Sequence, residues 1–234
     1  MSARKNNFFV LVGTHGSGKT EVHERLKKMF PGNSCVFPCD SNGGGASDAS
    51  HVRFTTRVTQ IARDGCHKEI PPDAQLSFFW ARLSTLIHGE VLEWYRQGKL
   101  IIMNGFGGTI LSHALSVADD NQIDDLVALH KAHISACVLA RDLEPPLYIH
   151  LRASSDVSCE RLSRQGRVDD LDEFRRYANR VNEMIDFYGN LPGQTVVPVD
   201  ANQSIECVID DVCAVIGAYY PQYENLLDKE ILST

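Results

Sequence analysis

The sequence lacks the features of a membrane-spanning or secreted protein. No hydrophobic run in its 234 residues approaches the roughly 18 consecutive apolar residues of a transmembrane helix. After residues 1–5 only a short apolar run, residues 8–12, precedes a glycine, which is too brief for the core of a signal peptide. We therefore expect a cytoplasmic protein with no membrane partner.

Cysteine pairs and an excess of basic charge are also missing. The seven cysteines include no C-x-x-C pair, so we expect reduced thiols rather than disulfides or a zinc site. Lys and Arg number 23 against 30 Asp and Glu, and this net charge of −7 argues against extended contact with a nucleic acid backbone. It leaves room for a local basic pocket. The composition, with 43% hydrophobic and 23% charged residues, is typical of a globular domain, and we expect one domain over residues 1–234.

Short apolar runs alternate with longer amphipathic stretches along the chain, which is typical of parallel strands joined by helices. The expected strands are residues 8–12, 35–38, 100–103, 147–151 and 195–199. The expected helices are residues 20–30, 51–62, 73–96, 122–141, 154–164, 171–188 and 205–219. The pattern predicts a three-layer α/β/α fold with a five-stranded parallel sheet, followed by an appended tail at about residues 221–234.

The first expected strand leads into a phosphate-binding motif. Residues 13–20 read G-T-H-G-S-G-K-T, which is the Walker A pattern between a strand and a helix. The glycines let backbone N–H groups surround an anionic oxygen, and the start of the helix adds its positive dipole end. Lys19 is expected to reach the β- and γ-phosphates, and the Thr20 hydroxyl to ligate Mg²⁺. The pattern therefore predicts that ATP and Mg²⁺ bind here, through Gly13, His15, Gly16, Ser17, Gly18, Lys19 and Thr20.

Motifs of two other P-loop classes are absent from the sequence. There is no N-K-x-D guanine motif, and the strand at residues 100–103 ends in Asn104-Gly105 instead of the acid of a mechanical ATPase. Neither a GTPase nor a mechanical ATPase fits well. Small size and a single domain instead favour a small-molecule kinase.

A late arginine cluster supports the kinase interpretation. Arg161, Arg164 and Arg167 are spaced three apart on an expected helix and its exit loop, where guanidinium groups can clamp phosphate oxygens. We expect a closing lid over about residues 161–170, with Arg164 and Arg167 as catalytic residues. The alternative is a solvated charged face on which the arginines pair with neighbouring acids.

In the order of these motifs the chain resembles the thymidylate kinase and deoxynucleoside kinase group of P-loop kinases. Residues 151–170 are similar to the deoxynucleoside kinase lid, and C-D-S-N-G-G at 39–44 stands where thymidylate kinases carry R-E-P-G-G. Residues 78–82, F-F-W-A-R, resemble the F-x-A-x-R stretch of thymidylate kinases, and residues 199–205 match the closing segment. The resemblance implies a phosphotransferase that uses ATP and Mg²⁺ and acts on a nucleotide or nucleoside, with thymidine-type acceptors first. Homodimers are common in these families.

The same resemblance implies an acceptor site on the aromatic helix. Phe78 would stack on the acceptor base and Arg82 would hydrogen-bond a base edge, which is reasonable because the two residues lie one helical turn apart. The alternative is that these aromatics belong to the core. Since three adjacent aromatics cannot share one helix face, we expect at least one of Phe78, Phe79 and Trp80 to be a core residue.

The chain also departs from the family pattern. The third strand ends in Asn104-Gly105, where thymidylate kinases have D-R-Y and deoxynucleoside kinases E-R-S, and His15 stands where the families tend to carry Asp or Asn. Asn104 can hydrogen-bond an acceptor hydroxyl or a metal-bound water, but it cannot act as a base.

Two other residues are candidates for the missing groups. Asp40, after the second strand, is the candidate general base or acceptor-positioning acid, and a loop-capping role is its alternative. Arg53 is the candidate acceptor-phosphate ligand, with a helix-surface position as its alternative. His113, His130 and His133 show no metal-ligand pattern and are interpreted as surface or hydrogen-bonded polar residues.

Three hypotheses remain open at this stage. The first is a kinase for thymidylate or a related pyrimidine deoxynucleotide. The second is a kinase with an altered acceptor, such as a modified nucleotide, a base within DNA or a small metabolite. The third is a regulatory protein that binds ATP and transfers nothing.

Overall fold

A computed structural model describes residues 6–30, 35–37, 70–139, 142–167 and 170–223 of the chain. Asp40, Arg53, the glycine-rich segment 41–50 and the expected helix 51–62 lie outside the described residues, as does the end of the expected tail.

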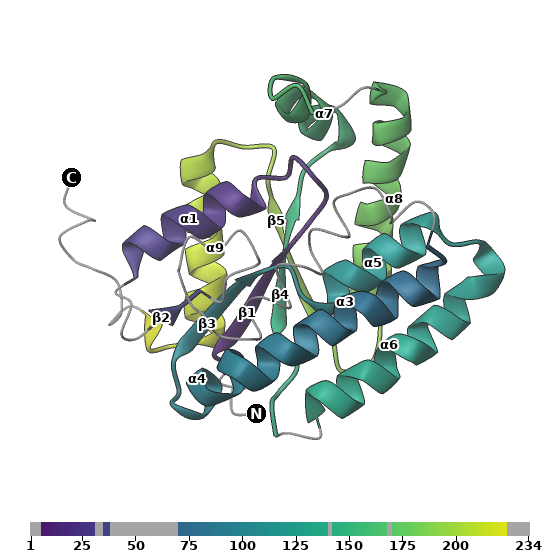
Figure 1. Cartoon of the computed structure of the whole chain (residues 1–234). Coiled ribbons are helices and arrows are strands. Elements are labelled where there is room, and N and C mark those ends of the chain that lie inside the picture. The colour runs from purple at the N-terminus through teal and green to yellow at the C-terminus, as the bar shows by residue number, and fades with distance from the viewer. Residues whose placement is uncertain (1–5, 31–34, 38–69, 140–141, 168–169, 224–234) are drawn as a thin grey trace.

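The centre of the fold is a five-stranded parallel sheet with strand order β2-β3-β1-β4-β5 (Figure 1). The strands are β1 (Phe8–Val12), β2 (Cys35–Val36), β3 (Leu100–Asn104), β4 (Leu147–Arg152) and β5 (Thr195–Asp200). The predicted strands and the predicted fold class are therefore confirmed. The order places β1 at the centre, where the loop that follows it opens between its neighbours β3 and β4.

Helices cover both faces of the sheet (Figure 1). One face carries α1 (Lys19–Met29) and α9 (Ile205–Tyr219), and the other carries α3 (Pro72–Leu86), α5 (Gly107–Val117), α6 (Ile123–Cys137) and α8 (Leu171–Gly189). β1 is buried on both sides: Phe8 and Val10 face the layer of α3, whereas Phe9 and Leu11 face α1 and α9. This accounts for its continuous apolar run. α7 (Ser155–Ser163), which contains the start of the lid predicted at about residues 161–170, lies beyond the C-terminal ends of the strands.

The long helix expected at residues 73–96 is present, with a π-helical turn inside it. α3 continues through the turn Ile87–Val91 into α4 (Leu92–Arg96). Pro72 stands at the first position of α3, and Gly98, with a φ of 69°, follows the end of α4. The helix therefore begins at a proline and ends before a glycine, which are the usual start and stop signals of a helix in a sequence.

α5 is the element that the sequence pattern does not predict. It begins with Gly107-Gly108, which look like a continuation of the loop after β3. A Cβ atom at Gly107 would lie 2.6 Å from Cζ2 of Trp80, and one at Gly108 would lie 2.7 Å from Cε1 of Tyr188. The glycines therefore let the start of α5 pack directly on aromatic rings of α3 and α8. A short 3₁₀ turn (Asp120–Gln122) leads from α5 to α6.

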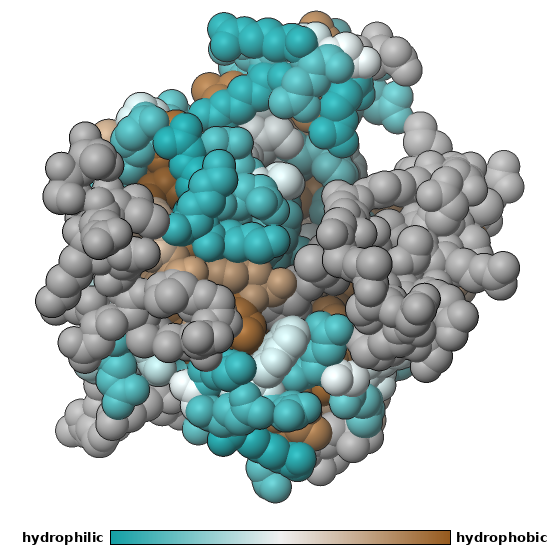
Figure 2. All heavy atoms as spheres, turned by 60° about the vertical axis from the view of Figure 1, so that its left-hand side comes forward, coloured by the Kyte–Doolittle hydropathy of each residue, from teal (hydrophilic) through white to brown (hydrophobic). Residues whose placement is uncertain are grey.

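Among the described residues, no helix combines the length and the apolar character needed to cross a membrane. Figure 2 shows the side of the molecule to which α1 belongs, where hydrophilic residues cover much of the described surface. On α1, Glu21, Glu24, Lys27 and Lys28 are exposed, while Val22 and Leu26 are buried against the sheet. The helix is therefore amphipathic in the way a surface layer requires.

Candidate active site

The loop between β1 and α1 has the backbone of a phosphate-binding loop. Gly13, Gly16 and Gly18 have φ values of 150°, 79° and 92°. A Cβ atom would lie 2.6 Å from the Leu151 carbonyl oxygen at Gly13, and 2.7 Å from the Ser158 carbonyl oxygen at Gly16. Glycine is therefore required at both positions, by conformation as well as by space.

Lys19 lies over this loop. Its Nζ donates hydrogen bonds to the carbonyl oxygens of Gly13 at 2.7 Å and Thr14 at 2.8 Å. Burial disfavours the charged ammonium and lowers the pKa of Lys19 to about 8, although both carbonyl acceptors favour the charged form. At neutral pH, Lys19 therefore places a positive charge at the loop.

The loop also contains polar groups suited to an anion. Thr14 and Ser17 are buried, and their hydroxyl oxygens have no hydrogen-bond partner among the described residues. Two unsatisfied hydroxyls beside the half-buried Lys19 and the start of a helix fit the oxygens of a phosphate group. The residues of the loop therefore fit a nucleoside triphosphate.

Thr20 and Asn104 lie in contact at the C-terminal edge of the sheet. Asn104 ends β3, whose register pairs it with Leu11 of β1, and its Nδ2 donates to the Thr20 hydroxyl at 3.4 Å. Hydroxyl and amide oxygens are hard donors of the kind that Mg²⁺ takes alongside water and phosphate. The described residues contain no group of three or more His, Cys, Asp or Glu side chains that could hold a metal by themselves. Thr20 is therefore a residue that could hold Mg²⁺ together with the phosphates of a bound nucleotide.

The lid helix α7 packs closely on the phosphate-binding loop. Arg161 donates from Nη1 to the Gly16 carbonyl oxygen at 3.3 Å. Arg164 is exposed and pairs with Glu160 four residues earlier, and Arg167 is exposed with Nη1 at 3.4 Å from Gln165 Oε1. Of the predicted arginine cluster, the structure therefore brings Arg161 to the loop. The catalytic roles of Arg164 and Arg167 stay predictions.

Arg161 was part of the cluster, but spacing alone did not distinguish it from the other two arginines. The sequence carries no signal for this choice, because it depends on how α7 packs against the loop.

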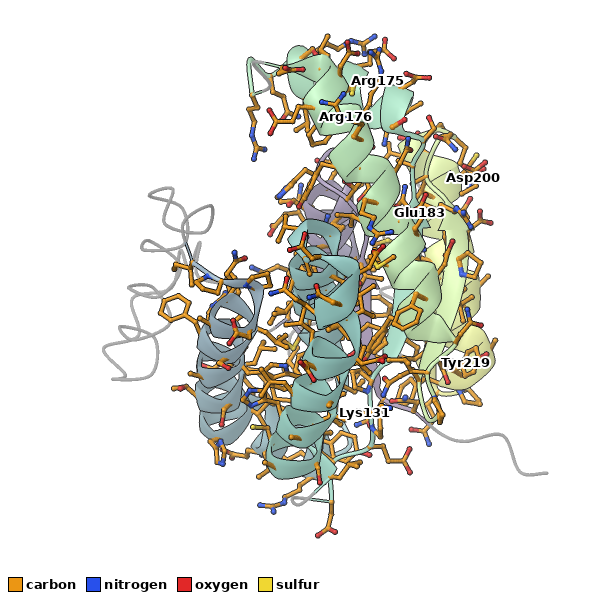
Figure 3. All side chains as sticks on the ribbon, turned by 90° about the vertical axis from the view of Figure 1, so that its right-hand side faces the viewer. Lys131, Arg175, Arg176, Glu183, Asp200 and Tyr219 are labelled. Atoms are coloured by element: carbon orange, nitrogen blue, oxygen red, sulfur yellow. The ribbon has the colours of Figure 1, made fainter. Side chains whose placement is uncertain are left out.

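The base of the lid is tied to two other elements. The Asn202 side chain accepts a hydrogen bond from the Ser154 backbone N–H at 2.8 Å, and Asn182 of α8 donates to the Ala153 carbonyl oxygen at 3.0 Å. Arg175, at the lid end of α8, pairs with Asp156 of α7 at 2.9 Å (Figure 3). These contacts fix where α7 begins.

A groove of about 560 Å³ opens beside the lid base, between α8 and the end of β5. Its lining includes Arg152, Glu183 and Asp200, of which Figure 3 labels the last two. The lining of the groove includes no residue of the phosphate-binding loop, so the groove is separate from that loop.

α3 places Phe78 and Arg82 one turn apart, both half-buried. Burial lowers the pKa of Arg82 to about 10, and the guanidinium keeps its charge at neutral pH. Trp80 is fully buried, and its Nε1 donates to His130 Nδ1 at 3.2 Å. The expectation that one of the three aromatics belongs to the core is confirmed. Base recognition by Phe78 and Arg82 stays a prediction.

Comparison with known proteins extends this description over almost the whole chain. No protein-family model matches it. The chain is 24% identical over 224 residues to a thymidylate kinase from Pseudoalteromonas translucida (strain TAC 125), and this match covers 93% of the chain and 99% of that protein. The chain is a divergent, thymidylate kinase-like protein. The resemblance read from the motifs is confirmed, and the match supports kinase activity in general terms.

This thymidylate kinase-like chain differs from the family pattern at Gly105. Gly105 has a φ of 83°, and the nearest atom to a Cβ placed there is Thr109 Oγ1, at 3.8 Å. This position, where the family pattern has arginine, therefore has room for a side chain, but its backbone is left-handed, which disfavours any residue other than glycine.

A cluster of aromatic and imidazole rings lies beside the phosphate-binding loop. The His15 ring centroid lies 5.6 Å from that of His113 on α5 and 6.2 Å from that of Tyr177 on α8. The Tyr177 hydroxyl is hydrogen-bonded to His113 Nδ1, and Phe174 packs on Tyr177. His113 is therefore a hydrogen-bonded polar residue, as interpreted from the sequence, but its place beside the loop could not be predicted, because the cluster forms only when the loop, α5 and α8 come together.

Proposed function

We propose that this chain transfers the γ-phosphoryl group of ATP, with Mg²⁺, to a pyrimidine deoxynucleotide, with thymidylate as the first candidate. The observation that carries the proposal is the phosphate-binding loop, in which Lys19 and Arg161 both reach backbone carbonyls of the loop. The match to a thymidylate kinase over nearly the whole chain also supports the proposal.

Each part of the site has a role in this proposal. Lys19 neutralises charge on the β- and γ-phosphates, and Thr20 holds the metal. The transferred group is stabilised by a lid arginine: Arg161 in the present arrangement, or Arg164 and Arg167 if the lid closes further. Phe78 stacks on the acceptor base and Arg82 hydrogen-bonds its edge. Asp40 and Arg53, which lie outside the described residues, are proposed to orient the acceptor and to bind its phosphate.

The chemistry suits a site with little acid–base machinery. An oxygen of the acceptor forms a bond to the γ-phosphorus while the bond to the bridging oxygen breaks, and ADP leaves with that electron pair. The catalytic contribution is mainly positioning and charge stabilisation. Asn104 in place of an acid is therefore compatible with transfer.

An altered acceptor is the second candidate function, and Asn104 with Gly105 is the observation that favours it. Replacing Asn104 with Asp tests it: a thymidylate kinase with a weakened site should gain activity, whereas an enzyme adapted to another acceptor should not. Gly105→Arg is a poorer test, since an L-residue in the left-handed conformation costs roughly 1–2 kcal/mol. A regulatory ATP-binding protein without transfer is the third candidate.

Three further statements belong to the same proposal. We propose a cytoplasmic protein that folds as a single domain, with a lid at about residues 161–170. A homodimer is proposed from the resemblance to the thymidylate kinase and deoxynucleoside kinase families. Stable association with nucleic acid is not part of the proposal, in keeping with the net charge of −7.

The decisive experiment measures ADP formation from MgATP over a panel of acceptors. The panel holds nucleosides, nucleoside monophosphates, modified pyrimidine nucleotides, and single- and double-stranded DNA. Lys19→Ala is the blank, and Lys28→Ala, an exposed lysine on the same helix, is the matched control. Turnover confined to thymidylate supports the proposal, and turnover on another acceptor supports the altered-acceptor function. Tight ATP binding without any turnover would leave the regulatory function.

A further inference from the structure

The peptide group between Ala153 and Ser154 is held from both sides by asparagine side chains. Asn182 of α8 donates from Nδ2 to the carbonyl oxygen of this group, that of Ala153, at 3.0 Å. Asn202, in the turn after β5, accepts from its N–H, that of Ser154, at 2.8 Å. The peptide is trans, so its C=O and N–H lie in one plane and point in opposite directions. Rotation of this peptide group would therefore break both hydrogen bonds.

α7 begins directly after this peptide group. Ser154 is the N-cap of α7, and its Oγ accepts from the Val157 N–H at 3.2 Å. Arg161 lies about two helical turns further along, where its Nη1 contacts the Gly16 carbonyl oxygen at 3.3 Å. Two turns span about 11 Å, so a rotation of about 10° at the start of the helix would move Arg161 by about 2 Å. The plane of one peptide group therefore decides whether Arg161 reaches the loop.

A buried histidine orients the amide of Asn182. The Ala153 carbonyl oxygen can only accept a hydrogen bond, so Asn182 must face it with its amide nitrogen and present its oxygen to the other side. There His150 Nε2 lies 3.1 Å from Asn182 Oδ1, and it must be the donor. Both the neutral imidazole protonated on Nε2 and the imidazolium can donate in this way. His150 of β4 therefore fixes the orientation of the Asn182 amide, whatever its own charge.

Burial makes this contact more important than the ion pair that also joins α8 to α7. His150 is fully buried and Asn182 is 8% exposed. A buried polar group that loses its partner gains no bond to water in exchange, so one orientation of the amide is strongly favoured. The ion pair between Arg175 and Asp156 lies at the surface, where such pairs contribute little. The buried amide is therefore the stronger of these two links between α8 and the lid.

We propose that Asn182 and Asn202 are positioning residues for phosphoryl transfer, which fix the peptide group before α7 so that Arg161 reaches the phosphate-binding loop. His150 is a positioning residue one step further away, since it acts through Asn182. This inference rests on the proposed function and concerns the lid of the same site. Loss of any of the three side chains should lower turnover through Arg161, while the loop itself still binds MgATP.

The test uses one variant for each side of the peptide group. Asn182→Asp keeps the size of the side chain but replaces the amide donor with a carboxylate oxygen. Asn202→Ala removes the acceptor on the other side, and because Asn202 is exposed this variant should fold even if a buried variant does not. Asn179→Ala is the matched control, since Asn179 is an exposed asparagine of α8 that lines the same groove. Melting temperatures show whether each variant is folded.

His150 has its own pair of variants. His150→Gln retains a side-chain N–H that can donate to Asn182, whereas His150→Leu has no donor. We expect His150→Leu to lower kcat and His150→Gln to recover part of that loss. A role in packing alone would give the opposite order, because leucine suits a fully buried position better than glutamine.

The readouts are kcat with saturating MgATP and thymidine 5′-monophosphate, and the Kd of MgATP from calorimetric titration. We expect Asn182→Asp and Asn202→Ala to lower kcat about tenfold or more, because a displacement of about 1 Å at a catalytic group is enough for such a loss. The Kd of MgATP should change less than about threefold, and Asn179→Ala should match the wild type in both readouts. In an Arg161→Ala background the same changes should cause no further loss of kcat, since they act through that arginine.

The outcomes separate this inference from the proposed function. If Asn182→Asp and Asn202→Ala keep the kcat of the wild type, or lower it equally with and without Arg161, the inference fails while the kinase function stands. If the wild type uses another acceptor of the panel, that acceptor replaces thymidine 5′-monophosphate in the same comparison. If nothing is turned over, the proposed function fails, and amide hydrogen exchange of residues 154–163 decides the inference. Faster exchange in Asn182→Asp and Asn202→Ala than in the wild type supports it, and equal exchange overturns it.

Discussion

Gly16 shows how a single residue joins the lid to the phosphate-binding loop. It combines a φ of 79° with a Cβ position 2.7 Å from the Ser158 carbonyl oxygen of α7. Alanine at this position would have to adopt a left-handed backbone and would also push α7 away from the loop. Both effects act on the same few atoms that are proposed to bind the phosphates of ATP.

We predict that Gly16→Ala weakens MgATP binding at least tenfold and destabilises the fold by more than the roughly 1–2 kcal/mol of left-handed strain alone. Gly193→Ala is the matched control, because Gly193 has a φ of 82° with nothing within 4 Å of its Cβ position. Urea denaturation and calorimetric titration with MgATP measure the two effects. Equal losses of stability in the two variants would show that the contact with α7 does not constrain the loop.

Lys19 gives a prediction about pH. Burial lowers its pKa to about 8 in the free protein, and bound phosphates favour the charged form. Below about pH 8 the ammonium is already charged, so affinity for MgATP should be nearly constant there. Above that pH, binding must take up a proton, and affinity should fall by up to about tenfold per pH unit.

Calorimetric titration with MgATP between pH 7 and 9.5 measures this dependence. Lys19→Arg keeps its charge throughout the range and should bind with little change in affinity, even if more weakly overall. If the affinity of the wild type for MgATP does not change over this pH range, burial does not lower the pKa of Lys19 to about 8.

Among the elements, the layer of α3, α5, α6 and α8 is held by a buried polar network. His130 of α6 accepts from Trp80 Nε1 at 3.2 Å, and its Nε2 lies 3.4 Å from the Tyr188 hydroxyl of α8. Tyr188 in turn donates to Gln194 at 2.7 Å. The network works with a neutral imidazole, because Nδ1 must be an acceptor.

Protonation of His130 should therefore unfold this layer. Burial lowers its pKa from 6.5 to about 3 in the folded protein, and the unfolded chain binds a proton near pH 6.5. Between these values the unfolded state binds more protons, so stability is complete above about pH 6.5 and falls with decreasing pH. The free energy of unfolding should decrease by up to about 1.4 kcal/mol per pH unit from this group, until about pH 3.

Urea denaturation of the wild type and of His130→Gln at pH 7, 6, 5 and 4 tests this assignment. The variant should be less stable at pH 7 but should show a shallower decrease, because it has no imidazole to protonate there. His88→Gln, which changes an exposed histidine, should show the same dependence of the free energy of unfolding on pH as the wild type. If the free energy of unfolding falls equally with pH in His130→Gln and in the wild type, a group other than His130 causes the acid sensitivity.

The elements that the sequence predicted correctly are those with local signals. The strands follow from short apolar runs, and the long helix from Pro72 to Arg96 follows from its proline start and its glycine stop. α5 has no such signal, since Gly107 and Gly108 are there to fit Trp80, Tyr148 and Tyr188 from other elements. A glycine required by tertiary contact looks the same in the sequence as a glycine required by a turn.

At the scale of the whole molecule, the same limit applies to the site. The conformation of the loop from Gly13 to Thr20 could be predicted, because its motif is contained in eight consecutive residues. The ring cluster and the choice among the lid arginines could not, because each depends on how distant segments pack. Arg161 reaches Gly16 only because α7 lies across the loop, tied at its base to α8 and to the turn after β5.

The three arginines of the predicted lid should differ in how strongly their loss lowers kcat. Arg161 already contacts the loop, whereas Arg164 and Arg167 bond to side chains of the lid itself. If the arrangement persists when the substrates bind, Arg161→Ala should lower kcat about 100-fold or more, in keeping with the large effects of arginines that neutralise a transferred phosphoryl group. Arg164→Ala and Arg167→Ala should then lower it less than about threefold.

Single-turnover measurements with saturating MgATP isolate this step from product release. Glu160→Ala is the informative companion variant, because it frees Arg164 from its ion pair and leaves Arg161 unchanged. A large loss in Arg164→Ala or Arg167→Ala, together with a gain in Glu160→Ala, would contradict the assignment to Arg161. That result would require the lid to close further over the loop, since in the present arrangement Arg164 is exposed and held by Glu160.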